Sequence, residues 1–491
     1  MPVIKLTSGT IRQALLSVVC AIVLAGCSSM APDYERSELP IASDWAQQQS
    51  KTLEQTSGLT SQKAAELPWR QFIHEPRLTQ VIELALSSNR SLRETLADVE
   101  SARATYRIQK ADLYPQITAG LSGTRAKSSD GDISTLYQAE AGLSGYEIDL
   151  FGKNRSLSEA DMQSYLASAE TAKAAQIALI GEVANAWLTL ASDSSLLSLA
   201  KETAANAQKT MEITQKRLEL GVDSKIDLAS AQTVYHTARS DIASFNTQVE
   251  QDINALRLLV GQQIDATVLP SALPDDADFV SDVPAGLSSD VLLQRPDVLS
   301  AEHDLKSANA DIGAARAAFF PSLSLTATGG LASSVLADIF SGGASSIWTL
   351  APSLNIPIFT GGANDAQLAF TQAQKQKFLA AYEYTIQSAF SEVADALARK
   401  ATIQEQLDAQ EALVAAATRS YDLSLARYKG GVDSFQNALE AQRTMYSASQ
   451  TLISTRQTDL VNRVTLYRVL GGGLADTGNA DVVANNADYN P

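Results

Sequence analysis

The hydrophobic positions of this 491-residue chain follow two different periods. No proline lies between Pro115 and Pro270 or between Pro357 and Pro491, and proline breaks helices. In the first of these gaps, apolar residues recur at steps of three and four, namely Ile177, Ile180, Ala184, Trp187 and Ala191, and then Tyr235, Ala238, Ile242, Phe245 and Val249. This period is typical of amphipathic, coiled-coil-like helices. As a helix, the segment 156–220 alone would be about 100 Å long, so the pattern predicts an elongated object.

Shorter segments next to the prolines alternate between polar and apolar residues. Two such segments lie within 116–149 and two within 322–359, and each candidate strand is about ten residues long, the length that a tilted transmembrane strand needs. Ordinary surface hairpins have the same alternation. The pattern therefore predicts four strands and leaves their surroundings open.

The two halves of the chain are similar. Residues 217–224 align with 427–434 at an offset of 210, and Tyr114-Pro115 aligns with Phe320-Pro321 at an offset of 206. Each half is predicted as a helix, two strands, a long helix, a tight turn and a second long helix. The predicted division is a signal peptide (1–26), an N-terminal segment (27–75), a first repeat (76–264, with strands 116–149 and helical hairpin 155–260), a linker (265–290), a second repeat (291–473, with strands 322–359 and helical hairpin 363–470) and a C-terminal tail (474–491).

The N-terminus has the character of an export signal. Lys5 and Arg12 precede a short apolar stretch, and Leu24-Ala25-Gly26-Cys27 resembles the bacterial lipoprotein signal, in which Cys27 is acylated after cleavage. Ordinary cleavage beside a bystander cysteine is the alternative. No apolar run of 18 residues follows, so any membrane crossing is expected to use strands.

Composition argues against catalysis and nucleic-acid binding. The chain has 38 Lys and Arg against 55 Asp and Glu, a net charge of −17 that becomes −19 without residues 1–26, and it shows no basic cluster that would neutralise phosphates. Two cysteines near the start and three scattered histidines offer no disulfide framework and little material for metal or acid–base chemistry. We expect no enzyme activity, no metal site, and no cofactor apart from the covalent lipid on Cys27.

Four strands in one chain cannot form a closed wall. In lipid, a four-stranded sheet would leave two unpaired edges, and each unsatisfied backbone group costs several kcal/mol. Two chains would supply eight strands and three would supply twelve. If the strands lie in a membrane, the chain must be an oligomer.

The repeated Gly-Val-Asp-Ser turns are predicted to reverse the long helices. Glycine adopts the left-handed conformation that ends a helix, and the following Asp and Ser can cap the returning helix. Arg217 and Arg427 lie in the last turn, where a cation opposes the negative helix end. Local capping accounts for at least part of this pattern.

Several motifs in this order resemble the TolC-family outer-membrane factors, in the lipoprotein (OprM/NodT-like) branch that serves RND-type tripartite efflux systems. They are residues 146–153, 295–298, 314–322, 357–362 and 467–473, together with both turns. The resemblance implies an α+β membrane protein of the Gram-negative outer membrane: a homotrimer whose twelve-stranded β-barrel continues into a long periplasmic α-helical barrel. It also implies a periplasmic adaptor, an inner-membrane RND-type transporter, and the passive export of drugs, metals or other small toxic compounds.

By position, the resemblance assigns two sets of site residues near the turns. The periplasmic aperture would use Asp227, Tyr428, Asp433, Asn437 and Glu440. The adaptor-docking helical tips would use Arg217, Gly221, Val222, Asp223, Ser224, Arg427, Gly431, Val432 and Ser434. Asp433 stands where some relatives carry Arg, so an intersubunit salt-bridge lock of that kind does not carry over. A solvated helix face remains the alternative for each acid.

Two other functions are compatible with parts of the pattern. A periplasmic coiled-coil lipoprotein without a pore would explain the helices and the lipid but not the duplicated strand pairs. An outer-membrane duct for peptide or protein secretion would keep the channel and change the cargo. The sequence identifies neither the substrate nor the cognate pump and adaptor.

Overall fold

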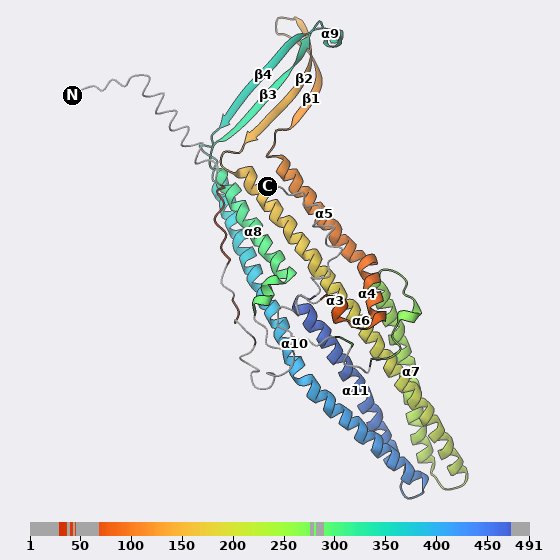
Figure 1. Ribbon diagram of the computed structural model, residues 1–491. Helices are drawn as coiled ribbons and strands as arrows, with labels where there is room; N and C mark the ends of the chain where they lie inside the picture. The colour runs from red at the N-terminus through yellow and green to blue at the C-terminus, as the bar shows by residue number, and fades with distance from the viewer. Residues whose placement is uncertain are drawn as a thin grey trace, which may run out of the picture. The chain divides into compact units, whose positions relative to one another are not determined.

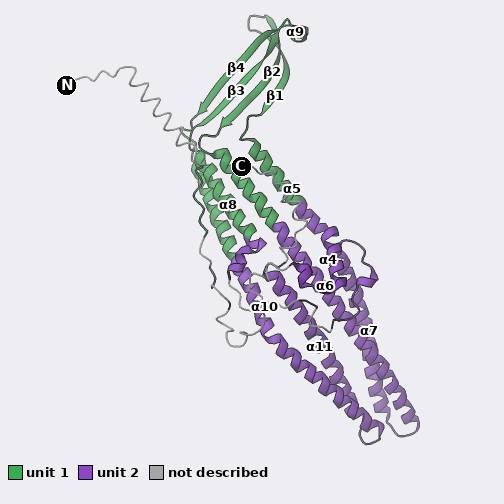
Figure 2. Cartoon of the chain, in the orientation of Figure 1, with its two compact units in different colours: residues 1–38, 97–170, 299–384 green, residues 39–96, 171–298, 385–491 purple. Residues whose placement is uncertain are grey.

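The computed structural model describes residues 29–36, 40–42, 45, 68–274, 279–280 and 289–472. The predicted signal peptide, Cys27 and the tail 474–491 lie outside the described residues. The chain divides into two compact units: unit 1 is Met1–Glu38, Ala97–Glu170 and Leu299–Tyr384, and unit 2 is Leu39–Leu96, Thr171–Val298 and Thr385–Pro491 (Figure 2). Each unit takes parts of both sequence repeats, and the domain boundaries given above stay predictions.

Each half of the chain contains a helix, two strands and two long helices in the same order, with additional short elements that differ between the halves (Figure 1). The first half contains α3 (Trp69–Phe72), α4 (Pro76–Ser88), α5 (Arg90–Ala111), β1 (Ile117–Lys127), β2 (Ile133–Ile148), α6 (Lys153–Glu219), α7 (Lys225–Val260) and the 3-10 helix η2 (Ala266–Val268). The second half contains the 3-10 helix η4 (Ser289–Gln294), α8 (Pro296–Ala317), β3 (Ser322–Ser333), α9 (Leu336–Ser341), β4 (Ser345–Asn355), α10 (Ala363–Lys429) and α11 (Phe435–Val469). The long hairpins are therefore α6/α7 and α10/α11.

The four strands of unit 1 form one antiparallel sheet in the order β1-β2-β3-β4. All four lie within the ranges that the alternation predicts. Among the described residues, β1 and β4 each have one unpaired edge. A register shift in β2 between Leu143 and Tyr146 contains Gly145, whose positive φ of 67° suits a bulge. The short helix α9 was not predicted, and its Ile339 is buried.

The apolar stripe predicted for α6 is confirmed as core of the structure. Ile177, Ile180, Ala184, Trp187 and Ala191 are all buried. The Trp187 ring stacks on Phe279 at 5.6 Å between centroids, and its Nε1 donates to the carbonyl oxygen of Val268 over 3.3 Å. On α7, in contrast, Ala238 is buried but the other four stripe residues are only half-buried within one chain.

The sequence predicted no membrane-spanning helix after the signal. Among the described helices, α6 alone is long and apolar enough by composition, with a window of mean hydropathy 1.3, and 56% of that window is buried inside the structure. A helix in the core of a protein can be equally long and apolar, and the buried stripe identifies α6 as such a helix.

Residues 29–36 lie against α8 within unit 1. Arg36 donates to Glu302 over 2.6 Å and Tyr34 donates to the same carboxylate over 3.2 Å. Burial acts to raise the pKa of Glu302, but the hydrogen bonds from Arg36 and Lys306 outweigh it and hold this pKa below its usual range. The backbone at Ala31 passes so close to Gly313 that an added Cβ would lie 2.6 Å from its nitrogen. This segment, just after the predicted lipid site, is therefore fixed to the helix by side-chain and backbone contacts.

Candidate functional site at the hairpin tips

Both predicted turns, which lie in unit 2, have the same backbone geometry. Gly221 has a φ of 73° and Gly431 a φ of 71°. The amide of Val222 donates to the carbonyl oxygen of Arg217 over 2.8 Å, and the amide of Val432 donates to that of Arg427 over 3.0 Å. These are left-handed glycine turns that satisfy the last carbonyl groups of a helix. The turn chemistry predicted from the sequence is therefore present twice.

The caps of the two returning helices differ. Ser224 and Asp227 form a capping box, in which Ser224 Oγ accepts from the Asp227 amide over 3.1 Å and Asp227 Oδ2 accepts from the Ser224 amide over 2.9 Å. Ser434 makes no side-chain cap. Asp433 instead accepts from the Ser434 amide over 2.9 Å and from Asn437 Nδ2 over 2.7 Å. These bonds and the Arg427 guanidinium lower the pKa of Asp433.

Tyr428 at the end of α10 links the second tip to the first. Its hydroxyl donates to the carboxylate of Asp223 and lies 3.2 Å from the hydroxyl of Thr214. Arg217 Nε donates to Asp223 over 3.0 Å, and its guanidinium carbon lies 4.8 Å from the centroid of the Tyr428 ring. The Asp223 side chain is only 6% exposed. Burial and the hydrogen bond to Asp223 both raise the pKa of Tyr428, so this hydroxyl stays a donor.

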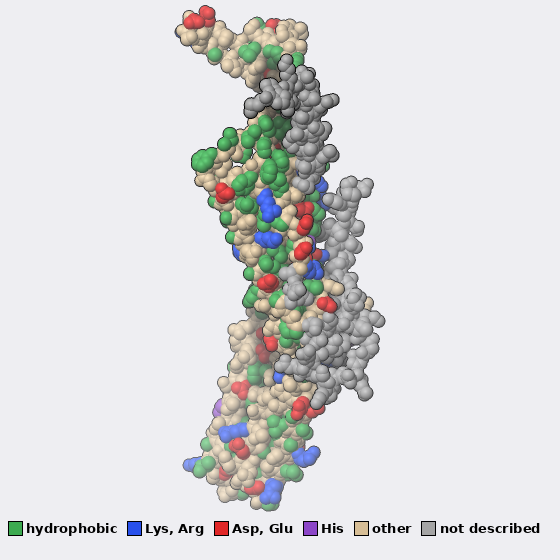
Figure 3. Space-filling view, turned by 90° about the vertical axis from the view of Figure 1, so that its left-hand side faces the viewer, with side chains coloured by type: hydrophobic (Ala, Val, Ile, Leu, Met, Phe, Trp, Pro, Cys, Tyr) green, Lys and Arg blue, Asp and Glu red, His purple; other side chains and the backbone are tan. Residues whose placement is uncertain are grey.

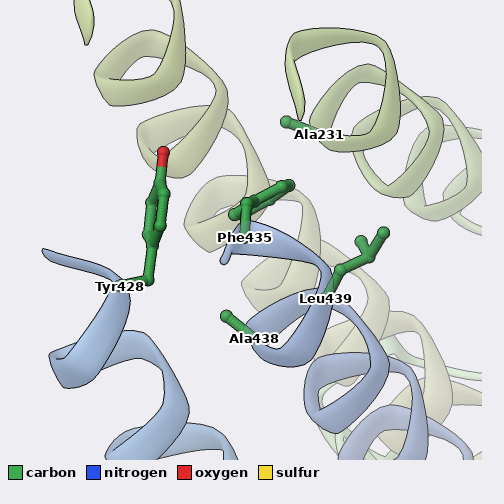
Figure 4. Close-up of a cluster of buried hydrophobic side chains, with 5 residues drawn as sticks. All are labelled: Ala231, Tyr428, Phe435, Ala438 and Leu439. Carbon is green, nitrogen blue, oxygen red and sulfur yellow. The ribbon is translucent and has the colours of Figure 1, made fainter. Parts of the chain in front are cut away.

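A small hydrophobic core lies directly beside this polar network. Figure 4 shows its buried members, Ala231, Tyr428, Phe435, Ala438 and Leu439. The rings of Tyr428 and Phe435 are 5.0 Å apart and tilted by 54°. Because Ala231 belongs to α7 and the others to α10 and α11, the cluster packs one hairpin against the other. The polar bridge therefore lies next to a well-packed apolar cluster that includes the Tyr428 ring.

The structure brings some predicted residues together and separates others. Arg217, Asp223 and Tyr428 meet in one network, while Arg427, Asp433 and Asn437 form a second, more exposed group. Glu440 is exposed on α11 and belongs to neither group. Thr214 was not predicted. In the sequence, Tyr428 stands out only because it aligns with Leu218 and so breaks the internal repeat; nothing there identifies Asp223 as its partner.

Apolar side chains are exposed at both tips. Val222 is 62% exposed and Val432 is 69% exposed, and Leu220 and Ile226 beside the first turn are also exposed. Figure 3 shows hydrophobic, acidic and basic side chains intermixed at the hairpin end of unit 2. The exposed apolar side chains at the tips therefore lie among charged ones. Among the described residues, no group of three or more His, Cys, Asp or Glu is placed to hold a metal ion.

The family profile of the Outer membrane efflux protein matches residues 81–262 and 287–472, once in each half of the chain. The two matches cover most of the chain, and the chain belongs to this family. The family resemblance drawn from the motifs is thereby confirmed, and so is the internal duplication.

Named relatives are similar over nearly the whole length. The toluene efflux pump outer membrane protein TtgC of Pseudomonas putida is 43% identical over 96% of this chain and 98% of its own, and the antibiotic efflux pump outer membrane protein ArpC of Pseudomonas putida is similar to the same extent. Among solved structures, the open state of the Neisseria gonorrhoeae MtrE outer membrane channel is 37% identical, with a TM-score of 0.81 over 91% of this chain and 99% of that one.

The chain is therefore the outer-membrane channel component of an efflux system, and this family consists of transport ducts rather than enzymes. The predicted fold class is confirmed: an internally duplicated chain that joins membrane strands to long helical hairpins, as in the outer-membrane channels. The comparisons favour the efflux channel over the structural lipoprotein and the secretion duct.

Proposed function

We propose that three copies of this chain form the exit duct of a tripartite efflux pump in the Gram-negative outer membrane. Their sheets close into a twelve-stranded barrel, and their helical hairpins extend into the periplasm. The duct is passive. An inner-membrane RND-type transporter selects the small toxic compounds, and a periplasmic adaptor delivers them to the hairpin tips.

The observation that carries this proposal is an aromatic contact between residues that have equivalents in both repeats. Among the described residues, only one of the two equivalent pairs makes this contact within a single chain. Phe151, after β2, stacks on Phe320, before β3, with 4.7 Å between the ring centroids. The repeat equivalents of these residues are Phe359, after β4, and Tyr114, before β1. In one chain Phe359 is 90% exposed and Tyr114 is 63% exposed. Phe359 of one copy would therefore stack on Tyr114 of the next.

The same reasoning supplies the strand register at the seam between two copies. Inside the chain, Tyr146 pairs with Leu325 in the β2–β3 ladder. The repeat offsets transfer this pair to Leu354 on β4 and Ala119 on β1 of the next copy. In one chain β1 is exposed along its whole length and β4 everywhere except at Ile347. Pairing the two edges would satisfy the backbone groups that lipid cannot.

Contacts described above support proposals for closure of the duct, adaptor docking and the lipid anchor. The bridge Tyr428–Asp223 would hold the two hairpins of each copy together in the closed duct, with Asp227, Asp433, Asn437 and Glu440 in the surrounding aperture. The exposed tips around Val222 and Val432 would dock the adaptor. The segment 29–36 would hold the acylated Cys27 at unit 1, where lipid of the outer membrane anchors it.

Disulfide trapping at the seam tests the assembly. Leu354→Cys combined with Ala119→Cys should give a covalent ladder that ends at three chains after mild oxidation in lipid, because cross-strand neighbours lie within disulfide reach. Leu354→Cys combined with Thr118→Cys, whose side chain lies on the other face of β1, should remain a single chain. The purified protein should also carry ionic current in planar bilayers.

An absent ladder, or a ladder without an end at three, would contradict the closed trimer. A trimer that carries no current under any condition would contradict the channel. Each result addresses one part of the proposal.

A further inference from the structure

The sheet of unit 1 has one apolar and one polar face. Residues paired across antiparallel strands share a face, and neighbours along a strand point to opposite faces. The registers of the three ladders give one face the rows Ile117, Leu143, Ala327, Leu350 and Ala119, Ala141, Gly329, Trp348. The other face receives the rows Thr118, Gly142, Thr328, Thr349 and Gly120, Glu140, Gly330, Ile347. In a membrane barrel, the apolar face meets lipid and the polar face lines the lumen.

Glu140 lies in the middle of the membrane strands. The four strands contain only four charged residues, namely Arg125, Lys127, Glu140 and Glu147. Arg125 and Lys127 lie at the end of β1, and Glu147 lies next to the end of β2, where Lys153 pairs with it over 3.3 Å. Glu140 is in the centre of β2, far from either end. An ionisable side chain at such depth is costly unless it faces water.

The surroundings of Glu140 leave it open to the polar side. Its cross-strand neighbours are Gly120 and Gly330, which have no side chains to cover it. A hollow of about 220 Å³ on this face is lined by Glu140, Thr118, Ser122 and Thr328, among others. Gln138, two residues along the same face, donates to Glu140 Oε1 over 3.1 Å. In the part of the chain that the structure describes, Glu140 has no ion pair, so its charge is directed to solvent.

We propose that Glu140 forms a ring of three carboxylates in the membrane part of the lumen, and that this ring makes the duct favour cations over anions. The inference rests on the proposed trimer, in which each copy supplies one Glu140 at the same height. Rings of charged side chains set ion preference in channels, and a low-dielectric wall strengthens their field. The ring would act on inorganic cations and on cationic solutes, independently of the hairpin tips.

Reversal potentials in a KCl gradient across planar bilayers test the ring. The wild-type trimer should prefer K⁺ over Cl⁻, Glu140→Gln should lower this permeability ratio at least about twofold, and Glu140→Lys should lower it further. Glu147→Gln combined with Lys153→Gln is the matched control, because it removes a β2 carboxylate together with the cation paired with it and leaves the net charge unchanged. Its permeability ratio should stay close to that of the wild type.

Chemical labelling gives a second readout that does not depend on the tips. Once residues 1–26, which contain Cys20, are removed and Cys27 is acylated, no free cysteine would remain, so Glu140→Cys introduces one thiol for a cationic, water-soluble methanethiosulfonate. That thiol should react in the reconstituted protein, whereas the thiol of Ala141→Cys, on the apolar face, should be protected by lipid.

An unchanged permeability ratio in a conducting Glu140→Gln trimer overturns this inference alone. Protection of the thiol in Glu140→Cys together with reaction in Ala141→Cys overturns the assignment of the faces. A wild-type trimer without current overturns the proposed function and this inference with it.

Discussion

Tyr428 connects the two hairpin tips through a single oxygen atom. Asp223 accepts from it, Arg217 pairs with the same carboxylate, and the Tyr428 ring belongs to the hydrophobic cluster beside the network. Removing the hydroxyl alone would leave the ring packing intact. A substitution at Tyr428 can therefore test the polar bridge without disturbing the apolar contact.

Tyr428→Phe is expected to favour the open state of the duct. A hydrogen bond to a charged group contributes about 1.5–3 kcal/mol, which corresponds to a shift of roughly tenfold or more in a two-state equilibrium. Single-channel recording should show longer or more frequent open periods, and cells should take up large antibiotics more readily.

The matched control is Tyr446→Phe. Tyr446 donates to Asp241 over 2.9 Å, which is the same chemistry between the same two hairpins but farther from the tips. Both variants should lose similar thermal stability, and only Tyr428→Phe should leak. Equal leakage would mean that the bridge at the tip has no special role in closure.

At this scale the sequence predicted the turns well and the bridge poorly. Glycine at 221 and 431 was predictable because few other residues tolerate a positive φ. The contact between Tyr428 and Asp223 joins residues 205 positions apart and depends on how two long helices pack, which no local pattern encodes. The same limit hid the contacts of Tyr34 and Arg36 with Glu302.

The two repeats differ in the side chain that bonds to the last carbonyl groups of the second long helix, α7 in the first repeat and α11 in the second. At the start of α8, Arg295 donates to the carbonyl oxygen of Val469 over 2.8 Å and pairs with Asp297 and Glu392 at 2.6 and 3.0 Å. At the equivalent place before α5, Asn89 donates to the carbonyl oxygen of Leu259 over 2.6 Å and caps α5 at Leu92 over 2.7 Å. A cavity of about 980 Å³ lies beside Asn89.

Arg295→Ala should therefore loosen the second repeat more than Asn89→Ala loosens the first. We expect a loss of about 2–3 kcal/mol for Arg295, because its removal breaks two ion pairs as well as the bond to the Val469 carbonyl. For Asn89, whose removal breaks a cap and one carbonyl bond without an ion pair, we expect about 1–2 kcal/mol. Hydrogen exchange at the last turns of α11 and α7 measures the two effects in the full trimer. Greater exchange at α7 would reverse the assignment.

Element boundaries were predictable where periodicity is long or proline is near. The stripe from Ile177 to Ala191 specified α6, and the proline-flanked alternation specified all four strands. Helix α9 was missed because six residues are too few for a helical period to stand out from a loop. The register of β2 against β3 was also hidden, since it depends on a bulge rather than on alternation.

For the whole molecule, the proposed division of labour leaves substrate choice outside this chain. Two relatives that are equally similar to it are named for a toluene pump and for an antibiotic pump. A passive duct fits both names, because the pump and not the channel would discriminate between compounds. This view is tested by combining the duct with two different pumps.

Produced in place of either relative, this chain should restore tolerance to the compound that the resident pump exports. Minimum inhibitory concentrations for toluene and for the antibiotic measure the outcome. The double variant Val222→Asp, Val432→Asp should restore neither while still forming conducting trimers, because the added charges should disrupt only the tips at which we propose that the adaptor docks. Tolerance to one compound regardless of the pump would place selection in the duct.

The free edges of β1 and β4 also determine which chains can pair in one trimer. Backbone amides and carbonyls are alike in every polypeptide, so edge pairing by itself cannot tell a sister copy from a paralogue made in the same cell. In the proposed trimer, any preference for a sister copy must come from the side chains that meet along the seam, such as Tyr114 and Phe359. In bacteria that produce several such ducts, the seam residues must therefore discriminate between copies, or mixed trimers will form.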